Sequence, residues 1–271
     1  MNNYIEYGDK IAFHPGYYIK EIIEQSGLTQ EDFAKRLATT PKNISKLVNG
    51  EQNLSRDMAL KLSRMLGTSV DYWLNFQKKY DSLLAEFDSA KELEAEREVF
   101  KFIDYEYFRS NFGLPYCASP DEQIRLVREF LNIASLTVLA NKDFVDASDA
   151  LHNQKDISRV INSNIMIQIA INKALQVEAE RFNRRKFAKA AEYVLSLADA
   201  DSDPFPQIKQ SFQDAGVIFV MLPALQDSGI NCATKKIKNN IMLMMNDQKL
   251  SPDTFWLTLS HEVKSIINEG A

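Results

Sequence analysis

Cysteine is scarce in this sequence of 271 residues, with Cys117 and Cys232 as the only two. They lie far apart and have no metal-ligand spacing, which excludes a disulfide-stabilised scaffold and a zinc finger. We expect both thiols to stay reduced in a cytoplasm.

Long hydrophobic runs are also missing. No stretch approaches the length of a membrane span, and the opening residues, MNNYIEYGDK, lack the charged-then-apolar pattern of a signal peptide. We therefore expect a cytoplasmic protein with no membrane contact. The chain has no internal repeat or low-complexity tract, and its 45% hydrophobic content is ample for more than one core.

Positive charge is concentrated at the N-terminal end, although the whole chain carries a net charge of -5. Residues 1–85 hold 11 basic and 10 acidic residues, residues 86–200 hold 15 and 19, and residues 201–271 hold 6 and 8. A positive N-terminal part suits contact with nucleic acid. These three ranges are also the domains that we expect.

Helix-capping signals divide the stretch from His14 to Asp81 into five short helices. Thr29, Thr40, Ser55 and Ser69 each stand where a helix N-cap is expected, and Pro41 suits a first helical position. Asn49-Gly50 is a stop signal for the third helix. Apolar residues recur at helical spacing in each segment, so each helix has an inner face.

The second and third of these helices form a helix-turn-helix pattern, with a tight turn and a short, outwardly polar second member. Between Phe33 and Gly50 there are four basic residues and no carboxylate. An ordinary helical bundle with a solvated face is the alternative. It requires the capping, the turn spacing and the one-signed polarity to coincide by chance, so we favour DNA binding.

Several strings in this segment form one recognisable pattern: His14-Pro15-Gly16, Leu28-Thr29-Gln30, Ile44-Ser45, Asn49-Gly50, Ala59-Leu60-Lys61-Leu62-Ser63, Leu66-Gly67-Thr68-Ser69 and Trp73-Leu74-Asn75-Phe76-Gln77. Through them the segment resembles the Xre/Cro-type helix-turn-helix, specifically the HigA antitoxin branch, over about 68 residues without a gap. The turn departs from the family pattern, because Ala38 and Thr39 stand where glycine and an apolar residue are usual.

The third helix is expected to read DNA. Lys42, Asn43 and Lys46 lie on its outward face, and lysine and asparagine can pair with purine edges in the major groove. We expect phosphate contacts from residues at the ends and side of the two helices: Gln30, Thr40, Ser45 and Asn49. For Asn49 a helix C-cap is an equally good interpretation.

A twofold homodimer is expected, because one half-site of a few base pairs gives too little affinity. The contact could be formed by the fifth helix, with Trp73 and Phe76, or by the helical middle of the chain. The sequence does not decide between them.

The rest of the chain is expected to be helical and then mixed. Residues 86–98 predict a solvated helix, Ser119-Pro120 a helix start, and residues 128–140, 157–178 and 184–198 further helices. A composition break near residues 200–206 indicates a linker. Apolar runs at 217–222, 230–234 and 241–245 predict a small sheet, and Ser251-Pro252 a final helix. The fold class is therefore mainly α, with a small α+β C-terminal domain.

The last segment resembles the ImmA/IrrE-type metallopeptidase domain, in the strings AGVIFVMLPAL, GINCATKK, IMLMMND and FWLTLSHE. The family motif is H-E-x-x-H, with two zinc-binding histidines and a glutamate that activates water. Here His261 and Glu262 are in place, but Ser265 holds the position of the second ligand and Lys264 brings a cation. We therefore interpret this domain as a pseudo-peptidase with a zincin-like helix, no metal and no catalytic residue.

Two functions compete. The HigA resemblance implies a DNA-binding repressor that autoregulates its operon and neutralises a RelE/HigB-like toxin. The ImmA/IrrE resemblance implies a metallopeptidase or a stress regulator that senses a partner, and a phage or mobile-element repressor without a toxin is a third option. The intact recognition helix and the broken metal motif favour a non-enzymatic repressor and antitoxin without a cofactor, whose partners are operator DNA and a toxin.

Overall fold

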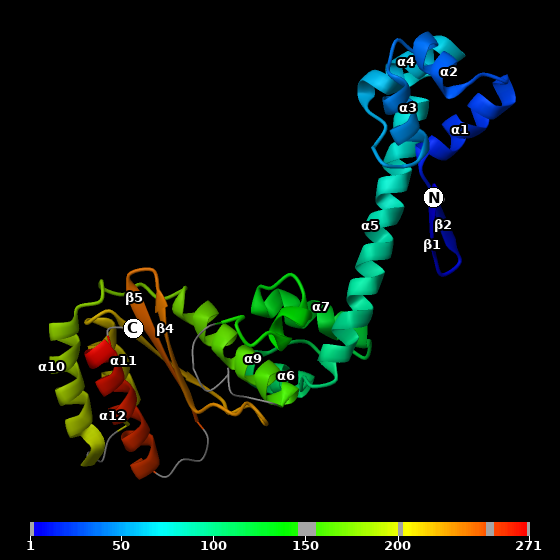
Figure 1. The fold of residues 1–271 in the computed structure, drawn as a ribbon. Coiled ribbons are helices and arrows are strands. Elements are labelled where there is room, and N and C mark those ends of the chain that lie inside the picture. Colours follow the sequence, from blue (N-terminus) through cyan, green and yellow to red (C-terminus); the bar gives the residue numbers. More distant parts are fainter. Residues whose placement is uncertain (1–2, 146–155, 200–202, 248–251, 270–271) are drawn as a thin grey trace. The chain divides into compact units, whose positions relative to one another are not determined.

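The computed structural model describes residues 3–145, 156–199, 203–247 and 252–269. The chain forms two compact units, Met1–Glu92 and Leu93–Ala271, which are described in turn. Helices dominate both, and Figure 1 colours the N-terminal unit in blue and cyan. No described helix has both the length and the apolar character that crossing a membrane requires.

The N-terminal unit begins with a β-hairpin that the sequence interpretation missed. Strand β1 (Tyr4–Tyr7) pairs antiparallel with β2 (Lys10–Phe13), and Gly8 has a positive φ of 61° in the turn between them. Each strand has only four residues, too few for a clear alternation of apolar and polar positions. Cross-strand stacking of Tyr4 on Phe13, with ring centroids 5.6 Å apart, stabilises the pair.

Four short helices follow: α1 (Pro15–Ser26), α2 (Gln30–Arg36), α3 (Pro41–Val48) and α4 (Arg56–Leu66). The predicted N-caps are confirmed, since the side chains of Thr29, Thr40 and Ser55 accept hydrogen bonds from the first turns of α2, α3 and α4. Burial of apolar side chains gives the unit one core, formed by Ile19, Phe33, Ile44, Leu62, Trp73 and their neighbours.

Helix α5 (Val70–Phe100) is one helix of 31 residues. The sequence interpretation separated a fifth helix, capped by Ser69, from a charged helix over 86–98. The Ser69 hydroxyl does accept a hydrogen bond from the Tyr72 amide at 3.0 Å. However, no glycine or proline stands between Ser69 and Phe100 to interrupt the helix. The expected boundary at residue 85 therefore falls inside a continuous helix.

The C-terminal unit contains most of the remaining helices. They are α6 (Tyr105–Phe112), α7 (Pro120–Leu131), the 3-10 helix η1 (Leu136–Ala140), α9 (Ile157–Ala174), α10 (Arg184–Leu195), the 3-10 helix η2 (Ser196–Asp199), α11 (Phe205–Gln213) and α12 (Pro252–Glu269).

One helix prediction needs correction, whereas the predicted helix start at Ser119-Pro120 is confirmed. A helix over 128–140 was expected, but Asn132 adopts a left-handed conformation with φ of 56° and ends α7, so η1 is a separate turn. Ser119 stands at the N-cap of α7 without a side-chain cap hydrogen bond. The predicted cap Ser251 and part of the predicted linker, residues 200–202, lie outside the described residues.

Three strands form the predicted sheet, in the order β3-β5-β4. Strand β3 (Val217–Leu222) is parallel to β5 (Asn240–Asn246), and β4 (Cys232–Ile237) is antiparallel to it. The apolar runs at 217–222 and 241–245 are thus confirmed as strands. Strand β4 begins two residues after the start of the run predicted at 230–234.

Helices cover both faces of this sheet. Ile218, Val220 and Met242 pack with α7 and α9 in one core, and Val217, Phe219 and Leu243 pack with α10, α11 and α12 in a second. Figure 1 shows α10, α11 and α12 beside the strands. Because a sheet that is apolar on both faces must be covered twice, the helices before residue 200 join the strands in one unit. The expected boundary at 200/201 does not separate two units.

Candidate nucleic-acid interface

Helices α2 and α3 form the two helices of the predicted motif. The Thr29 hydroxyl accepts from the Asp32 amide at 3.1 Å and starts α2. At its end, Leu37 is buried and Ala38 has a positive φ of 49°. This left-handed residue turns the chain, and the amide of Thr39 returns to the Ala34 carbonyl at 3.0 Å. Lys61 of α4 holds the turn from outside, donating to the Ala38 carbonyl at 3.3 Å.

Helix α3 is strongly amphipathic. Ile44, Leu47 and Val48 are buried in the core of the unit. Lys42, Asn43, Lys46 and Asn49 are all exposed on the remaining surface. The packing of the apolar side therefore fixes which polar side chains face solvent, and it presents the three predicted base-contact residues together.

The two lysines of α3 carry unneutralised positive charge. Within the described ranges of the chain, neither Lys42 nor Lys46 has a carboxylate in ion-pair distance. Lys35 of α2 differs, because its ammonium pairs with Glu31 at 2.9 Å, which raises the pKa of the lysine. In the same described ranges Arg36 of α2 has no ion pair either, so α3 supplies two of the three unpaired positive charges of the motif.

Asn43 is held in position by three interactions. Its amide side chain donates to the Thr39 hydroxyl at 3.2 Å, and its backbone amide donates to the Thr40 hydroxyl at the same distance. Its carbonyl accepts from the Gln52 side chain at 3.1 Å. Since these bonds fix the first turn of α3, the side chain is presented with little freedom.

The predicted phosphate-contact residues divide by their structural roles. Thr40 is the N-cap of α3, so its hydroxyl oxygen is already engaged. Asn49 stands at the C-cap position, before Gly50 with φ of 72°, and its side chain donates to the half-buried Ser45 hydroxyl at 3.4 Å. Gln30 is exposed at the first position of α2. The C-cap interpretation of Asn49 is therefore confirmed.

The far end of α3 rests on the start of α1, a contact that sequence reasoning did not identify. His14 is the N-cap of α1, and its Nδ1 accepts from the Gly16 amide at 2.9 Å. Burial lowers the pKa of His14, although Asp81 and the Gln52 carbonyl act against that shift. The Asn3 side chain also donates to the Val48 carbonyl. The His-Pro-Gly string was the only signal in the sequence.

The predicted metal motif on α12 does not gather ligands. The His261 side chain is 84% exposed, whereas that of Glu262 is 18% exposed. Glu262 accepts from the Cys232 thiol of β4 at 3.1 Å, and burial together with this carboxylate raises the pKa of Cys232 to about 12. Ser265 is half-buried one turn further along. Among the described residues, no three potential ligands form a metal cluster.

Comparisons with known proteins place the N-terminal unit in context. The family described as Helix-turn-helix matches residues 19–73. The chain is similar to virulence-associated protein I of Dichelobacter nodosus, at 36% identity over 28% of this chain and 72% of that protein. It is similar to the HTH-type transcriptional regulator YddM of Escherichia coli (strain K12), at 34% identity over 28% of this chain and 84% of that protein.

A third relative bears on the antitoxin resemblance. Antitoxin HigA-1 of Vibrio cholerae is 33% identical over 22% of this chain and 57% of that antitoxin. These similarities concern about the first 80 residues of the chain. Through this N-terminal unit, the chain belongs to the helix-turn-helix family of transcriptional regulators.

Proposed function

We propose that the protein is a sequence-specific DNA-binding repressor that acts as the antitoxin of a toxin-antitoxin module. The observation that carries the proposal is the exposed face of α3, which presents Lys42, Asn43 and Lys46 without a nearby carboxylate partner in the described structure. A short helix of this kind, packed behind a tight turn, suits insertion into a major groove.

In the proposed complex, base edges are read by α3. Lys42 and Lys46 donate to guanine O6 and N7, and Asn43 pairs with adenine N6 and N7. Gln30 holds a phosphate from the start of α2. Thr40, Ser45 and Asn49 support these contacts chiefly by fixing the ends of α3, since their side chains already take part in its capping and side-chain bonds.

A homodimer is part of the proposal. Each chain presents one short proposed recognition helix, α3. A single half-site read by one such helix supplies little discrimination between DNA sequences. Two copies would present two α3 helices about 34 Å apart on successive major grooves. The sequence suggests Trp73 and Phe76 for the contact. Trp73 is buried and donates to Thr68 at 2.8 Å, and Phe76 is partly buried against the core of the unit. Tyr72, which is 49% exposed and lies beside both rings, is therefore the better candidate.

Neutralisation of a toxin is proposed from the similarity to HigA-1, whose printed name is that of an antitoxin. The matched relatives correspond to less than a third of this chain. The unit from Leu93 onward can therefore have a function other than DNA binding. Peptidase activity is not proposed for it, because the carboxylate of Glu262 is engaged by Cys232.

The experiment that tests DNA recognition is selection of a randomised duplex library on the full chain. We expect enrichment of one motif with twofold symmetry, and binding of that motif about a thousandfold or more tighter than a scrambled duplex, as expected of specific binders. Equal affinity for both duplexes would contradict the proposal.

Toxin neutralisation has a separate test. A short reading frame beside the coding sequence is induced in a growth assay with and without this protein. We expect growth arrest in its absence and relief in its presence. Arrest that persists when both proteins are expressed at equal levels would overturn the antitoxin part and leave the repressor part standing.

A further inference from the structure

A hydrogen bond joins the turn of the DNA-binding motif to a side chain of the proposed recognition helix. The Asn43 side-chain nitrogen Nδ2 donates to the Thr39 hydroxyl at 3.2 Å. A primary amide has two N–H donors on its nitrogen and an acceptor oxygen. In the described structure no residue donates to the Asn43 Oδ1. One N–H group and the oxygen of this exposed amide therefore remain for a partner.

The turn before α3 fixes the place of the Thr39 hydroxyl. Thr39 is half-buried, and its backbone amide donates to the Ala34 carbonyl at 3.0 Å. The preceding residue, Ala38, is left-handed and accepts at its carbonyl from Lys61. The following residue, Thr40, is the N-cap of α3. Because the backbone is held on both sides and threonine is stiff at χ1, the hydroxyl is an acceptor with a fixed position.

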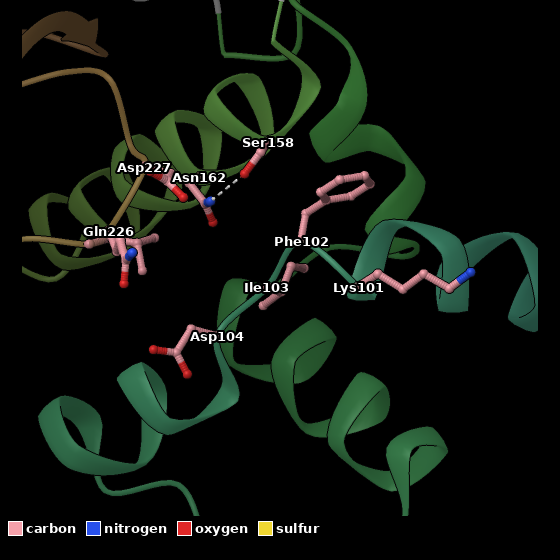
Figure 2. Close-up of a pocket in the computed structure, with 9 residues that line it drawn as sticks. Lys101, Phe102, Ile103, Asp104, Ser158, Asn162, Gln226 and Asp227 are labelled. Atoms are coloured by element: carbon pink, nitrogen blue, oxygen red, sulfur yellow. Dashed lines mark hydrogen bonds between the residues drawn. The ribbon is translucent and has the colours of Figure 1, made fainter.

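The same spacing of donor and acceptor occurs in helix α9, where Figure 2 draws it. The Asn162 nitrogen donates at 3.4 Å to the hydroxyl of Ser158, four residues earlier, and the Asn162 oxygen points away from that hydroxyl. Holding the nitrogen thus sets the direction of the oxygen. Asn162 is buried, with 4% of the residue exposed, whereas Asn43 is exposed on α3. Of these two amides, that of Asn43 can present its oxygen to another molecule.

An amide held in this way distinguishes the two purines in a major groove. Adenine presents the N6 donor beside the N7 acceptor, whereas guanine presents two acceptors, O6 and N7. One N–H group and Oδ1 of Asn43 match the adenine edge. Against guanine, Oδ1 would face O6, and two acceptors in contact leave each other unsatisfied. An amide that rotates freely can instead turn both of its N–H groups to guanine, and the bond to Thr39 opposes that rotation.

We propose that Thr39 is a positioning residue that makes Asn43 specific for adenine over guanine. The inference rests on the proposed function, because it requires α3 to lie in the major groove. Thr39 acts through the amide of Asn43 and does not itself contact a base. Gln52 holds the main chain of the same residue, donating to the Asn43 carbonyl at 3.1 Å. Bound DNA would exclude water from the bond between Thr39 and Asn43 and so strengthen it.

The hydrogen bond is tested first in the full chain without DNA, so this measurement does not depend on the repressor proposal. NMR relaxation reports the picosecond-to-nanosecond mobility of the Asn43 side-chain amide, whose signals are identified by their loss in Asn43→Ala. We expect an immobilised amide in the native chain and in Thr39→Ser, which keeps the hydroxyl. Thr39→Val and Thr39→Ala lack the hydroxyl and should release the amide. Equal mobility in the native chain and in both of these variants would overturn the proposal.

Base preference is tested on the selected operator, at the base pair whose preference is lost in Asn43→Ala. Titrations compare duplexes that carry adenine or guanine at this position. We expect the native chain to bind the adenine duplex about tenfold or more tighter. Thr39→Val should lower this ratio about two- to tenfold, the range of one hydrogen bond, and Thr39→Ser should keep it. A preference for guanine, an unchanged ratio in Thr39→Val, or no lost preference in Asn43→Ala would contradict the proposal.

Two controls separate the hydroxyl from the turn as a whole. Lys61→Met removes the bond to the Ala38 carbonyl and one positive charge, which affects both duplexes alike and should leave the ratio unchanged. In an Asn43→Ala background, Thr39→Val should also leave the ratio unchanged, because the amide that it positions is absent. A ratio lowered in either control would overturn the positioning role. Absence of any preferred duplex would count against the repressor proposal, whereas the NMR measurement decides the Thr39 bond by itself.

Discussion

The backbone of Gly16 lies so close to Leu47 that a Cβ on Gly16 would stand 1.9 Å from the Leu47 carbonyl oxygen. The start of α1 is thereby pressed against the last turn of α3, the proposed recognition helix. A side chain cannot enter this contact unless the two backbones separate. The contact at Gly16 thus helps to set the position of α3.

Gly16→Ala should destabilise the N-terminal unit by about 1–3 kcal/mol, the range for overpacking, or by more where backbone atoms clash. Gly27→Ala is a matched control, because Gly27 has a positive φ of 69° and open space around it, so it tests backbone strain alone. Chemical denaturation measures both variants. A smaller loss for Gly16→Ala than for Gly27→Ala would contradict the contact.

The left-handed turn at Ala38 leads to a prediction of the opposite sign. Alanine with φ of 49° is strained by about 1–2 kcal/mol, which exceeds the cost of about 0.4–1 kcal/mol from a more flexible unfolded chain. Ala38→Gly should therefore stabilise the protein by up to about 1 kcal/mol in a denaturation curve.

The same exchange at exposed Ala85, within helix α5, is the control. It should destabilise the protein by about 0.5–1 kcal/mol, because glycine weakens a helix interior. If Ala38→Gly destabilises as much as Ala85→Gly, the turn does not strain residue 38.

His14 predicts a pH dependence of stability. Burial lowers its pKa in the folded state below the ordinary value of 6.5, so the unfolded chain takes up the proton more readily. The free energy of unfolding should hold its full His14 contribution above pH 6.5 and fall as the pH decreases from there towards the lowered pKa. Denaturation at a series of pH values between about 5 and 8 measures this slope.

His14→Asn should flatten that slope, because asparagine preserves the N-cap of α1 and does not titrate. The variant is expected to be less stable at every pH, since the ring contact with Tyr80, at 5.0 Å between centroids, is lost. His261→Asn changes a side chain that is 84% exposed and should leave the slope as it is. A slope that survives His14→Asn would assign it to another group.

The C-terminal motif predicts the absence of a zinc site. Ser265 cannot replace a histidine ligand, and Glu262 is engaged by the Cys232 thiol. Metal analysis of the purified protein should find far less than one zinc per chain, and incubation with a chelator should leave its stability unchanged. One tightly bound zinc that is lost on His261→Ala would contradict this interpretation.

Much of the N-terminal unit was predictable because its signals are local. A hydroxyl three residues before a backbone amide defines an N-cap, so Thr29, Thr40 and Ser55 marked three helices correctly. The exposed positions of Lys42 and Lys46 followed from the spacing of Ile44 and Leu47 in the same helix.

What the sequence did not reveal depends on contacts between distant residues. The hairpin from Tyr4 to Phe13 has strands too short for a pattern, and Gly16 reveals its role only beside Leu47. The helices before residue 200 pack on the sheet because both of its faces are apolar. No local sequence pattern shows which helices cover a given face.

The most direct test of the account is a titration of the selected operator and a scrambled duplex with Lys42→Ala and Asn43→Ala, at several salt concentrations. Each change should cost about 1–3 kcal/mol on the operator and relax preference at one base position. Gln30→Ala should weaken both duplexes alike and leave the salt slope nearly unchanged, since a neutral contact releases no counterion. Lys78→Ala, exposed on α5, is the control for loss of one positive charge and should keep the specific affinity. The account predicts that the ratio of operator to scrambled affinity falls for Lys42→Ala and Asn43→Ala, and a ratio unchanged in both would contradict the assignment of α3 as the recognition helix.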